Sequence, residues 1–193
     1  MNLTEELRHS IIERLQLTEK LAKETNLELY DKEFIIDRKE LKQESSKKLK
    51  ARIKSSFKNS EDGIIYIIEL LDSNQYEEVK KYFKNAKKKN KNGRKYSKVN
   101  TENKACKYLY VGSSKGKNLA TRMRSHFGLG GKSVYSMHLL HSFPKDVDCK
   151  FKISLYKVDM PEQEKNAINL LELYEQELWD KCKPMFGKQS GLL

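Results

Sequence analysis

Tyrosine, arginine, histidine and glutamate side chains occur along this chain in an order that suits phosphodiester hydrolysis. Tyr66 and Tyr110 each lie in a short apolar run that predicts a strand. Arg122 and His126 are four residues apart in a predicted helix, so they project from one face, one turn apart. A long later helix supplies three carboxylates, at Glu172, Glu175 and Glu177.

These residue types divide the chemistry of phosphate hydrolysis between them. A carboxylate would hold a divalent cation that polarises the phosphate, and arginine would balance the charge that develops on it. Tyrosine or histidine would order or deprotonate the attacking water. Because tyrosine has a reference pKa of ~10, a nearby cation must lower that pKa before the phenol acts as a base at neutral pH.

Hydrophobic periodicity predicts the elements that position these residues. Short apolar runs predict three strands, at residues 64–71, 107–111 and 149–158. Helical spacing and end signals predict helices at residues 4–25, 38–57, 75–89, 119–127, 133–143 and 161–182. The first of these helices has an apolar stripe of Leu7, Ile11, Ile12, Leu15 and Leu21. Residues 90–104 lack periodicity, so a mobile loop is expected there.

Positive charge is concentrated in two blocks of the chain. The 193 residues include 39 Lys and Arg against 27 Asp and Glu, a formal net charge of +12. Residues 38–60 carry 9 basic and 2 acidic side chains, and residues 77–107 carry 12 and 3. Such blocks suit surfaces that neutralise phosphates, although solvated helix faces and a lysine-rich loop explain the charge equally well.

The same composition bears on the compartment. No run approaches the ~18–20 apolar residues of a membrane span, and the N-terminus lacks the basic-then-apolar layout of a signal peptide. The three cysteines, Cys106, Cys149 and Cys182, are scattered and odd in number. They suit a reducing cytoplasm and provide neither a disulfide framework nor a zinc cluster. We therefore expect a cytoplasmic protein that has a polyanionic partner and no membrane contact.

Four segments, taken in order, resemble the motifs of the GIY-YIG nucleases. The first half-motif is Ile64-Ile65-Tyr66, with Ile64 in the place of the family's first glycine, and the second is Tyr110-Val111-Gly112. Arg122 and His126 match the arginine and the histidine of the family's helix. Glu175 falls at the metal-binding glutamate, two turns before a proline. The resemblance covers roughly residues 61–191.

This resemblance implies an α/β fold, with a small three-stranded antiparallel sheet flanked by helices. The nuclease domain would comprise residues 61–193, and residues 1–60 would form an N-terminal helical extension. Family members usually join the two half-motifs by a short hairpin, so residues 72–106 are expected to be a basic insertion. Because most of the net charge lies there, deletion of residues 78–104 is expected to weaken DNA binding far more than folding.

The resemblance also implies a role for each residue of the site. Tyr66 would be the general base or a water-activating phenol, and Tyr110 would position the water or the scissile phosphate. Arg122 would stabilise the charge of the transition state, while His126 would assist proton transfer or bind phosphate. Glu175 would ligate the metal, Mg²⁺ or Mn²⁺; magnesium prefers carboxylate together with waters and substrate oxygens.

Two further sets of residues complete the expected site. The candidate nucleic-acid contacts are Lys80, Lys84, Lys87, Lys88, Lys89, Arg94, Lys95, Lys115 and Arg124. The family's late asparagine has no clear match, because Gly187 stands at about its place. Gln189 is the nearest amide and is the candidate substitute.

The predicted function is that of a metal-dependent DNA endonuclease, of the restriction or defence type. RNA is an alternative substrate, since a positive surface does not distinguish the two polyanions. A non-catalytic nucleic-acid-binding protein on a degenerate nuclease scaffold is the alternative function, which the missing asparagine and the altered glycine support. A homodimer is an option, because a double-strand cutter with one site per chain often acts as a dimer.

Overall fold

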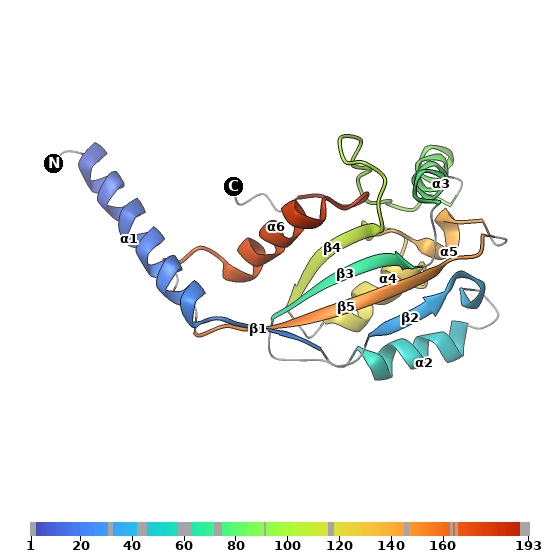
Figure 1. The fold of residues 1–193 in the computed structure, drawn as a ribbon, viewed down its shortest axis with the longest axis horizontal. Helices are drawn as coiled ribbons and strands as arrows, with labels where there is room; N and C mark the ends of the chain where they lie inside the picture. Colours follow the sequence, from blue (N-terminus) through green and yellow to red (C-terminus); the bar gives the residue numbers. More distant parts are fainter. Residues whose placement is uncertain are drawn as a thin grey trace.

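The centre of the protein is an antiparallel sheet of five strands. The computed structural model describes residues 3–30, 33–41, 46–57, 63–71, 75–90, 92–115, 118–144, 147–162, 164 and 166–189. The strands are β1 (Asn26–Leu29), β2 (Phe34–Asp37), β3 (Gly63–Leu71), β4 (Tyr108–Lys115) and β5 (Lys150–Asp159). Their order is β1-β5-β3-β4, and β2 also pairs with β5 (Figure 1).

The α/β class is confirmed, but the expectation of a three-stranded sheet was wrong. Two additional strands come from the N-terminal extension, where the sequence predicted only a break between helices. β1 and β2 lie one after the other along the same edge of β5. Phe34 and Ile36 of β2 point into the core opposite Ile153 and Phe151. Each strand has only four residues, which is too short for alternation to be recognised.

The three predicted strands are present, and β4 is longer than expected. It continues through residues 112–115, for which the sequence predicts a strand end and a turn. β3 is buried along nearly its whole length because helices cover both of its faces. This double burial explains why its sequence is a continuous apolar run without alternation.

The helices differ from the predictions mainly at their boundaries. They are α1 (Leu3–Glu24), α2 (Ser46–Ser56), α3 (Tyr76–Lys89), α4 (Leu119–Phe127), α5 (Leu139–Ser142) and α6 (Leu170–Cys182), with a 3₁₀ turn η1 (Arg38–Glu40). The bounds predicted for α4 are confirmed, and those for α3 hold to one residue. The predicted helix at 38–57 is split, because Asp37 caps the short turn η1. α6 begins nine residues later than Pro161, where the Asn169 side chain accepts the Glu172 amide.

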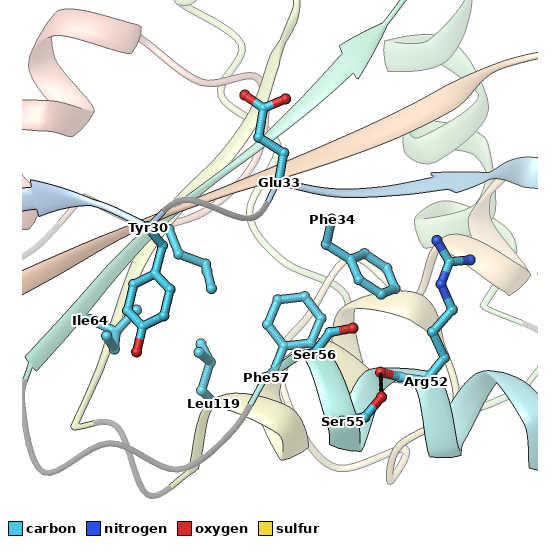
Figure 2. Close-up of a pocket in the computed structure, with 10 residues that line it drawn as sticks. Tyr30, Glu33, Phe34, Arg52, Ser55, Ser56, Phe57, Ile64 and Leu119 are labelled. Carbon is cyan, nitrogen blue, oxygen red and sulfur yellow. Dashed lines mark hydrogen bonds between the residues drawn. The ribbon is translucent and has the colours of Figure 1, made fainter.

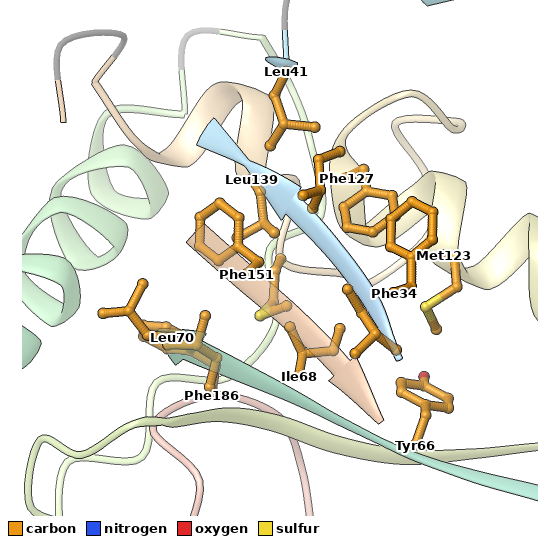
Figure 3. Close-up of a cluster of buried hydrophobic side chains, with 14 of the residues drawn as sticks. Phe34, Leu41, Tyr66, Ile68, Leu70, Met123, Phe127, Leu139, Phe151 and Phe186 are labelled. Carbon is orange, nitrogen blue, oxygen red and sulfur yellow. The ribbon is translucent and has the colours of Figure 1, made fainter. Parts of the chain in front are cut away.

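The helices lie on both faces of the sheet and enclose the cores. On one face, residues of α2, α3, α4 and α5 pack against β2, β3 and β5 in the main core (Figure 3). On the other face, Leu171 of α6 packs against Ile65 and Val158. Tyr66 lies at one end of the main core, with its ring among these apolar side chains (Figure 3).

Part of the basic insertion packs in this core, and the loop predicted to be mobile at residues 90–104 contributes buried side chains to it. Val79 and Phe83 of α3 are fully buried, and the Phe83 ring stacks on Phe186 at 4.0 Å. In the following loop, Tyr96 and Asn100 are buried. The Asn100 backbone and side chain donate to the Met185 and Pro184 carbonyls, both at 2.9 Å. The loop therefore closes over residues 184–186.

Helix α1 projects from the body of the protein (Figure 1). Its last turns pack against α6, where Leu21 is buried beside Ala167 and Leu170. The rest of its predicted apolar stripe is on the surface: Leu7, Ile11, Ile12 and Leu15 are between 45% and 58% exposed. No helix in the described ranges is long and apolar enough to cross a membrane.

Candidate active site

The two tyrosines of the half-motifs lie side by side because β3 and β4 pair antiparallel. In the register of this pair, Tyr66 is opposite Gly112 and Ile68 is opposite Tyr110. The phenol rings therefore lie on the same face as diagonal neighbours, with centroids 6.1 Å apart and an interplanar angle of 9°. β4 is an edge strand, so the pair lies close to the rim of the sheet.

Gly112 makes this arrangement sterically possible. A Cβ atom built at Gly112 would lie 2.6 Å from Tyr66 Oη and 2.8 Å from Tyr110 Cε1. Both distances are far shorter than van der Waals contact, and both involve rigid rings. The glycine that ends the second half-motif therefore leaves the space through which the Tyr66 phenol passes over β4.

Helix α4 places His126 against both rings. His126 Nε2 is 3.1 Å from Tyr66 Oη, and the imidazole is 4.5 Å from the Tyr110 ring, centroid to centroid. The Met137 backbone N–H donates to His126 Nδ1 at 3.5 Å. This contact assigns the proton of the neutral imidazole to Nε2, from which it is donated to the Tyr66 oxygen.

Burial sets the charge of His126. Its imidazole is buried, and burial together with the nearby Arg122 lowers its pKa to about 3. His126 is therefore neutral at physiological pH and carries no positive charge for a phosphate. Its geometry favours the hydrogen-bonding role with Tyr66 over the phosphate-binding role.

Arg122 is one turn before His126 on α4 and is the cation of the cluster. Its charge acts on the Tyr66 phenol, on Tyr110 and on Glu175. Tyr66, and to a smaller extent Tyr110 and Glu175, raise the pKa of Arg122, so the guanidinium stays charged. The side chain is exposed to solvent, which leaves it accessible to a substrate.

The Tyr66 oxygen thus receives the His126 Nε2–H and lies in the field of the Arg122 guanidinium. This pattern suits a phenolate, which only accepts hydrogen bonds. Burial nevertheless raises the pKa of Tyr66 well above its ordinary value of 10, Tyr110 raises it further, and Arg122 offsets only part of the shift. The phenol therefore keeps its proton at neutral pH unless more positive charge arrives.

Glu175 approaches from α6, on the opposite face of β4. Ser113, which follows Gly112 in β4, donates its Oγ hydrogen to Glu175 Oε2 at 2.5 Å. Burial raises the pKa of Glu175, while Ser113 and Arg122 lower it. The rival Glu172 is one turn earlier, and its charge also raises the pKa of Glu175. Ser113 and Arg122 single out Glu175 as the carboxylate that belongs to the cluster.

The donor set around Glu175 fits a magnesium ion held by one protein carboxylate. Burial makes its negative charge costly, and a divalent cation would relieve that cost. Magnesium usually keeps several waters and takes only one or two carboxylates from the protein. Within the described ranges, no group of three or more His, Cys, Asp or Glu side chains forms a ready-made metal cage. A site of the other kind, with substrate oxygens and water as ligands, is compatible with these residues.

Gly187 and Gln189, at the C-terminal end of the motif, lie in different environments. Gly187, at φ +108°, packs on the Tyr110 ring, and a Cβ there would lie 2.9 Å from Tyr110 Cε2. The Gln189 amide donates to Asp180 Oδ1 at 3.0 Å and is exposed. Among the contacts of the described residues, this amide is bound to Asp180 and not to Glu175.

The candidate nucleic-acid contacts divide into two groups. Three of them have polar contacts inside the protein: Lys80 with Asn103 O, Lys87 with Ser97 O, and Arg94 with Gly130 O and His138 Nδ1. Arg124 is half-buried, and its Nε lies in the interior. The others are exposed on the surface: Lys84, Lys88, Lys89, Lys95 and Lys115.

The sequence motifs contain the charged and aromatic members of the cluster but do not indicate the residues that hold them in place. Ser113 orients Glu175, and Met137 orients His126 through its backbone. Ser113 directly follows the second half-motif, which is the only signal that pointed to it. Met137 is eleven residues from His126 in sequence, so only the fold reveals this contact.

Comparison with known proteins adds no family to these observations. No protein-family model matches the chain, and no curated protein or solved structure matches it significantly.

Proposed function

We propose that this protein is a magnesium-dependent endonuclease that hydrolyses phosphodiester bonds of DNA, with a role in restriction or defence. The observation that supports the proposal is the convergence of five side chains at the rim of the sheet. They come from four different elements: Tyr66, Tyr110, Arg122, His126 and Glu175. The resemblance to GIY-YIG nucleases names the same five side chains from the sequence motifs.

In this proposal the chain's own groups perform distinct tasks. Arg122 is exposed and charged, so it would bind the scissile phosphate and balance the negative charge of the transition state. Tyr110 lies parallel to Tyr66 and would help to position the phosphate or the water. Glu175 would hold Mg²⁺ or Mn²⁺, and the ion would polarise the phosphate and add positive charge beside the phenols.

Once the positive charge beside it lowers the Tyr66 pKa, the phenol would release its own proton to solvent, and the resulting phenolate would accept the proton of the attacking water. His126 Nε2–H donates to Tyr66 Oη and the Arg122 guanidinium lies beside it, so the phenolate would find stabilising groups already in place. Without substrate the Tyr66 pKa is raised by burial, so the phenol would at first order the water by hydrogen bonding. His126 stays neutral throughout and holds the phenol oxygen in position.

The experiment is plasmid cleavage in magnesium, with variants that separate the site from its surroundings. We expect nicking or linearisation by the wild type, and none in excess EDTA. Tyr66→Phe and Glu175→Ala should each reduce the rate at least tenfold, because each removes a group that touches the reacting atoms or the metal. Glu172→Ala is the matched control, since it removes a carboxylate of the same helix one turn away and should retain most of the activity.

If Tyr66→Phe and Glu175→Ala both cut like the wild type, the assigned site is wrong. Intact plasmid after long incubation in magnesium and in manganese would favour the alternative, a nucleic-acid-binding protein without catalysis. That alternative has one structural observation behind it, since Gln189 is bound to Asp180 and Gly187 lacks a side chain. A parallel assay with RNA of the same sequence compares the two polyanions.

The cellular setting stays part of the proposal. We propose that the protein acts in the cytoplasm, where its three free cysteines would remain reduced. We also propose that it cuts double strands as a homodimer, because each chain brings one cluster of catalytic side chains. Sedimentation of the protein with and without DNA measures the number of chains in the active species.

A further inference from the structure

A cavity of about 750 Å³ lies beside the proposed catalytic cluster and has no role in it. Most of its lining comes from the N-terminal extension, and Ile64, Leu119 and Leu155 of the rest of the chain complete it (Figure 2). Its volume falls in the range of ~300–1,000 Å³ that is typical of sites for small organic groups. A cavity of this size can hold a nucleobase with its sugar.

The lining separates into an apolar floor and a polar rim. The floor consists of buried side chains, Phe34, Phe57, Ile64, Leu119 and Leu155. The rim consists of exposed ones, Tyr30, Glu33, Arg52, Ser55 and Ser56. Figure 2 shows the Tyr30 ring on one side of the cavity and the Phe34 and Phe57 rings on the other. An apolar floor with aromatic walls and hydroxyl groups at the rim suits a flat heteroaromatic group.

The charges at the rim are already paired within the protein. Glu33 forms an ion pair with Lys152. Arg52 donates to Glu40 Oε2 at 2.8 Å and to the Ile35 carbonyl at 2.6 Å, and its guanidinium lies 4.6 Å from the centroid of the Phe34 ring. Since these charges compensate one another, the cavity favours an uncharged ligand over a free anion.

The surface outside the cavity, along α2, is positively charged. Helix α2 supplies Ser55 and Ser56 to the rim. The same helix carries three exposed lysines, Lys47, Lys48 and Lys54. A neutral flat group would therefore enter the cavity, while negative charges attached to it would remain at the lysines. A base attached to a phosphate backbone has this distribution of charge.

The cavity is also close to the catalytic cluster. Ile64 precedes Tyr66 by two residues on the same face of β3, which is a distance of about 7 Å along the strand. Leu119 precedes Arg122 by three residues on α4, a rise of about 4.5 Å. Since stacked bases are ~3.4 Å apart along a duplex, these distances from Tyr66 and Arg122 correspond to about one to two base steps.

From these observations we infer that the cavity receives one nucleobase of the bound DNA, turned out of the base stack beside the cleavage site. Tyr30 would supply the exposed face on which that base stacks. Its ring is 42% exposed, while its backbone N–H donates to the Leu155 carbonyl at 2.8 Å and holds the residue at the edge of the cavity. Ser55, Ser56 and the Tyr30 hydroxyl would contact the edge of the base. The inference rests on the proposed function in taking DNA as the partner.

The test uses binding and not cleavage, so that it can fail independently of the proposed chemistry. Two 30-base-pair duplexes are compared in EDTA, one fully matched and one with a single central mismatch. A mismatched base costs less to unstack, so a protein that takes up an unstacked base binds the mismatched duplex more tightly. We expect at least a fivefold preference for the mismatched duplex in the wild type, a modest part of what base stacking on an aromatic ring contributes.

Three variants locate the preference at Tyr30. Tyr30→Ala should bind both duplexes within a factor of two of each other, while Tyr30→Phe, which keeps the ring, should retain the preference. Leu29→Ala is the matched control, since Leu29 is the adjacent residue, is exposed, and does not line the cavity. Equal thermal midpoints of the variants exclude a folding effect.

Several outcomes would overturn the inference. A wild type without the mismatch preference, or a Tyr30→Ala variant that keeps it, excludes an extruded base at this cavity. Binding of free dAMP that depends on Tyr30, in a protein without mismatch preference, identifies a site for free nucleotides instead. Plasmid cleavage without the preference overturns this inference alone, and a preference without cleavage overturns the catalytic proposal alone.

Discussion

Among the single residues of the cluster, Gly112 is as important for the arrangement as the charged side chains. Tyr66 and Tyr110 approach one another over Gly112, His126 donates to Tyr66 Oη, and the charge of Arg122 lowers the Tyr66 pKa. The hydrogen-bond pattern favours a phenolate, while burial favours the protonated phenol. The protonation state of Tyr66 during the reaction therefore depends on the charges that substrate and metal bring.

The prediction at this scale concerns Gly112→Ala. The added methyl group would overlap Tyr66 Oη at 2.6 Å, so the phenol must leave its position beside His126. We expect cleavage to fall at least tenfold and the free energy of unfolding to fall by about 1–3 kcal/mol, the usual cost of overpacking. Plasmid cleavage and urea unfolding, followed through the single tryptophan, measure the two effects.

The control for this prediction is Gly131→Ala. Around Gly131 the nearest atom to an added Cβ is Ser133 Oγ at 4.0 Å, so the methyl group has room. Its cleavage rate should stay within a factor of two of the wild type. A Gly112→Ala protein that cuts equally well would mean that the position of the Tyr66 phenol does not matter for the reaction.

Among the helices, α3 has two roles: one face packs in the core, and another exposes lysines to solvent. Val79 and Phe83 anchor the helix in the core, and Lys80 and Lys87 hold carbonyl groups of the following loop. Lys84, Lys88 and Lys89 are exposed to solvent. Deletion of the whole insertion would therefore remove part of the core together with the charge, so substitutions are the better test of DNA contact.

The prediction for α3 compares these two groups of lysines. Replacement of Lys84, Lys88 and Lys89 by Gln should weaken DNA binding and reduce the slope of log Kobs against log salt by up to ~0.9 for each phosphate that a lysine no longer neutralises. The free energy of unfolding should hardly change. Titrations of DNA binding between 50 and 200 mM salt, as a rough range, measure this slope.

Lys80→Gln with Lys87→Gln is the matched comparison on the same helix. Their Nζ atoms donate to Asn103 O at 2.6 Å and to Ser97 O at 2.8 Å. Loss of each hydrogen bond should lower the free energy of unfolding by about 0.5–1.5 kcal/mol. If the exposed triple variant binds DNA with an unchanged salt slope, α3 does not contact the phosphates.

In the molecule as a whole, the N-terminal extension is joined to residues 63–189 through the sheet. β1 and β2 cover the edge of β5, and Phe34 and Ile36 fill the main core. Arg38 is fully buried and donates to the carbonyls of Leu41 and Phe143. By contrast, the first four turns of α1 extend beyond the body with exposed side chains.

The prediction at this scale compares two truncations. Removal of residues 1–37 takes away β1, β2 and three buried apolar side chains, Leu21, Phe34 and Ile36, each of which contributes about 1.5–3 kcal/mol by burial alone. Since a domain has only about 5–15 kcal/mol of stability in total, we expect this fragment to lose its cooperative unfolding transition. Removal of residues 1–16 should leave the transition in place.

Urea unfolding of both truncated proteins, at equal concentration, measures the difference. A cooperative transition of the 38–193 fragment with unchanged midpoint would show that the rest of the fold is stable without the two additional strands. The same fragment also lacks Tyr30, so its DNA binding would lack the mismatch preference expected for the full chain.

Long apolar runs and regular spacing are the features that made part of this fold predictable. α4 is recognisable because its nine residues place apolar side chains at helical spacing, and β3 because a short apolar run rich in β-branched residues indicates a buried strand. Part of the candidate site was predictable in the same way, since the four-residue spacing of Arg122 and His126 places them on one face of a helix. β1 and β2 were not predictable, because four residues contain too few repeats of the alternation.

What the sequence determined by itself is the set of chemical groups and the elements on which they lie: two tyrosines on adjacent strands, an arginine and a histidine on one helix, and a glutamate on another. Only the tertiary structure decided which groups meet, because Ser113 with Glu175, Met137 with His126, and Tyr30 with Leu155 are contacts between distant parts of the chain. Local periodicity reports which residues share a face. It does not report which face another element will cover, and that depends on how all the elements exclude water together.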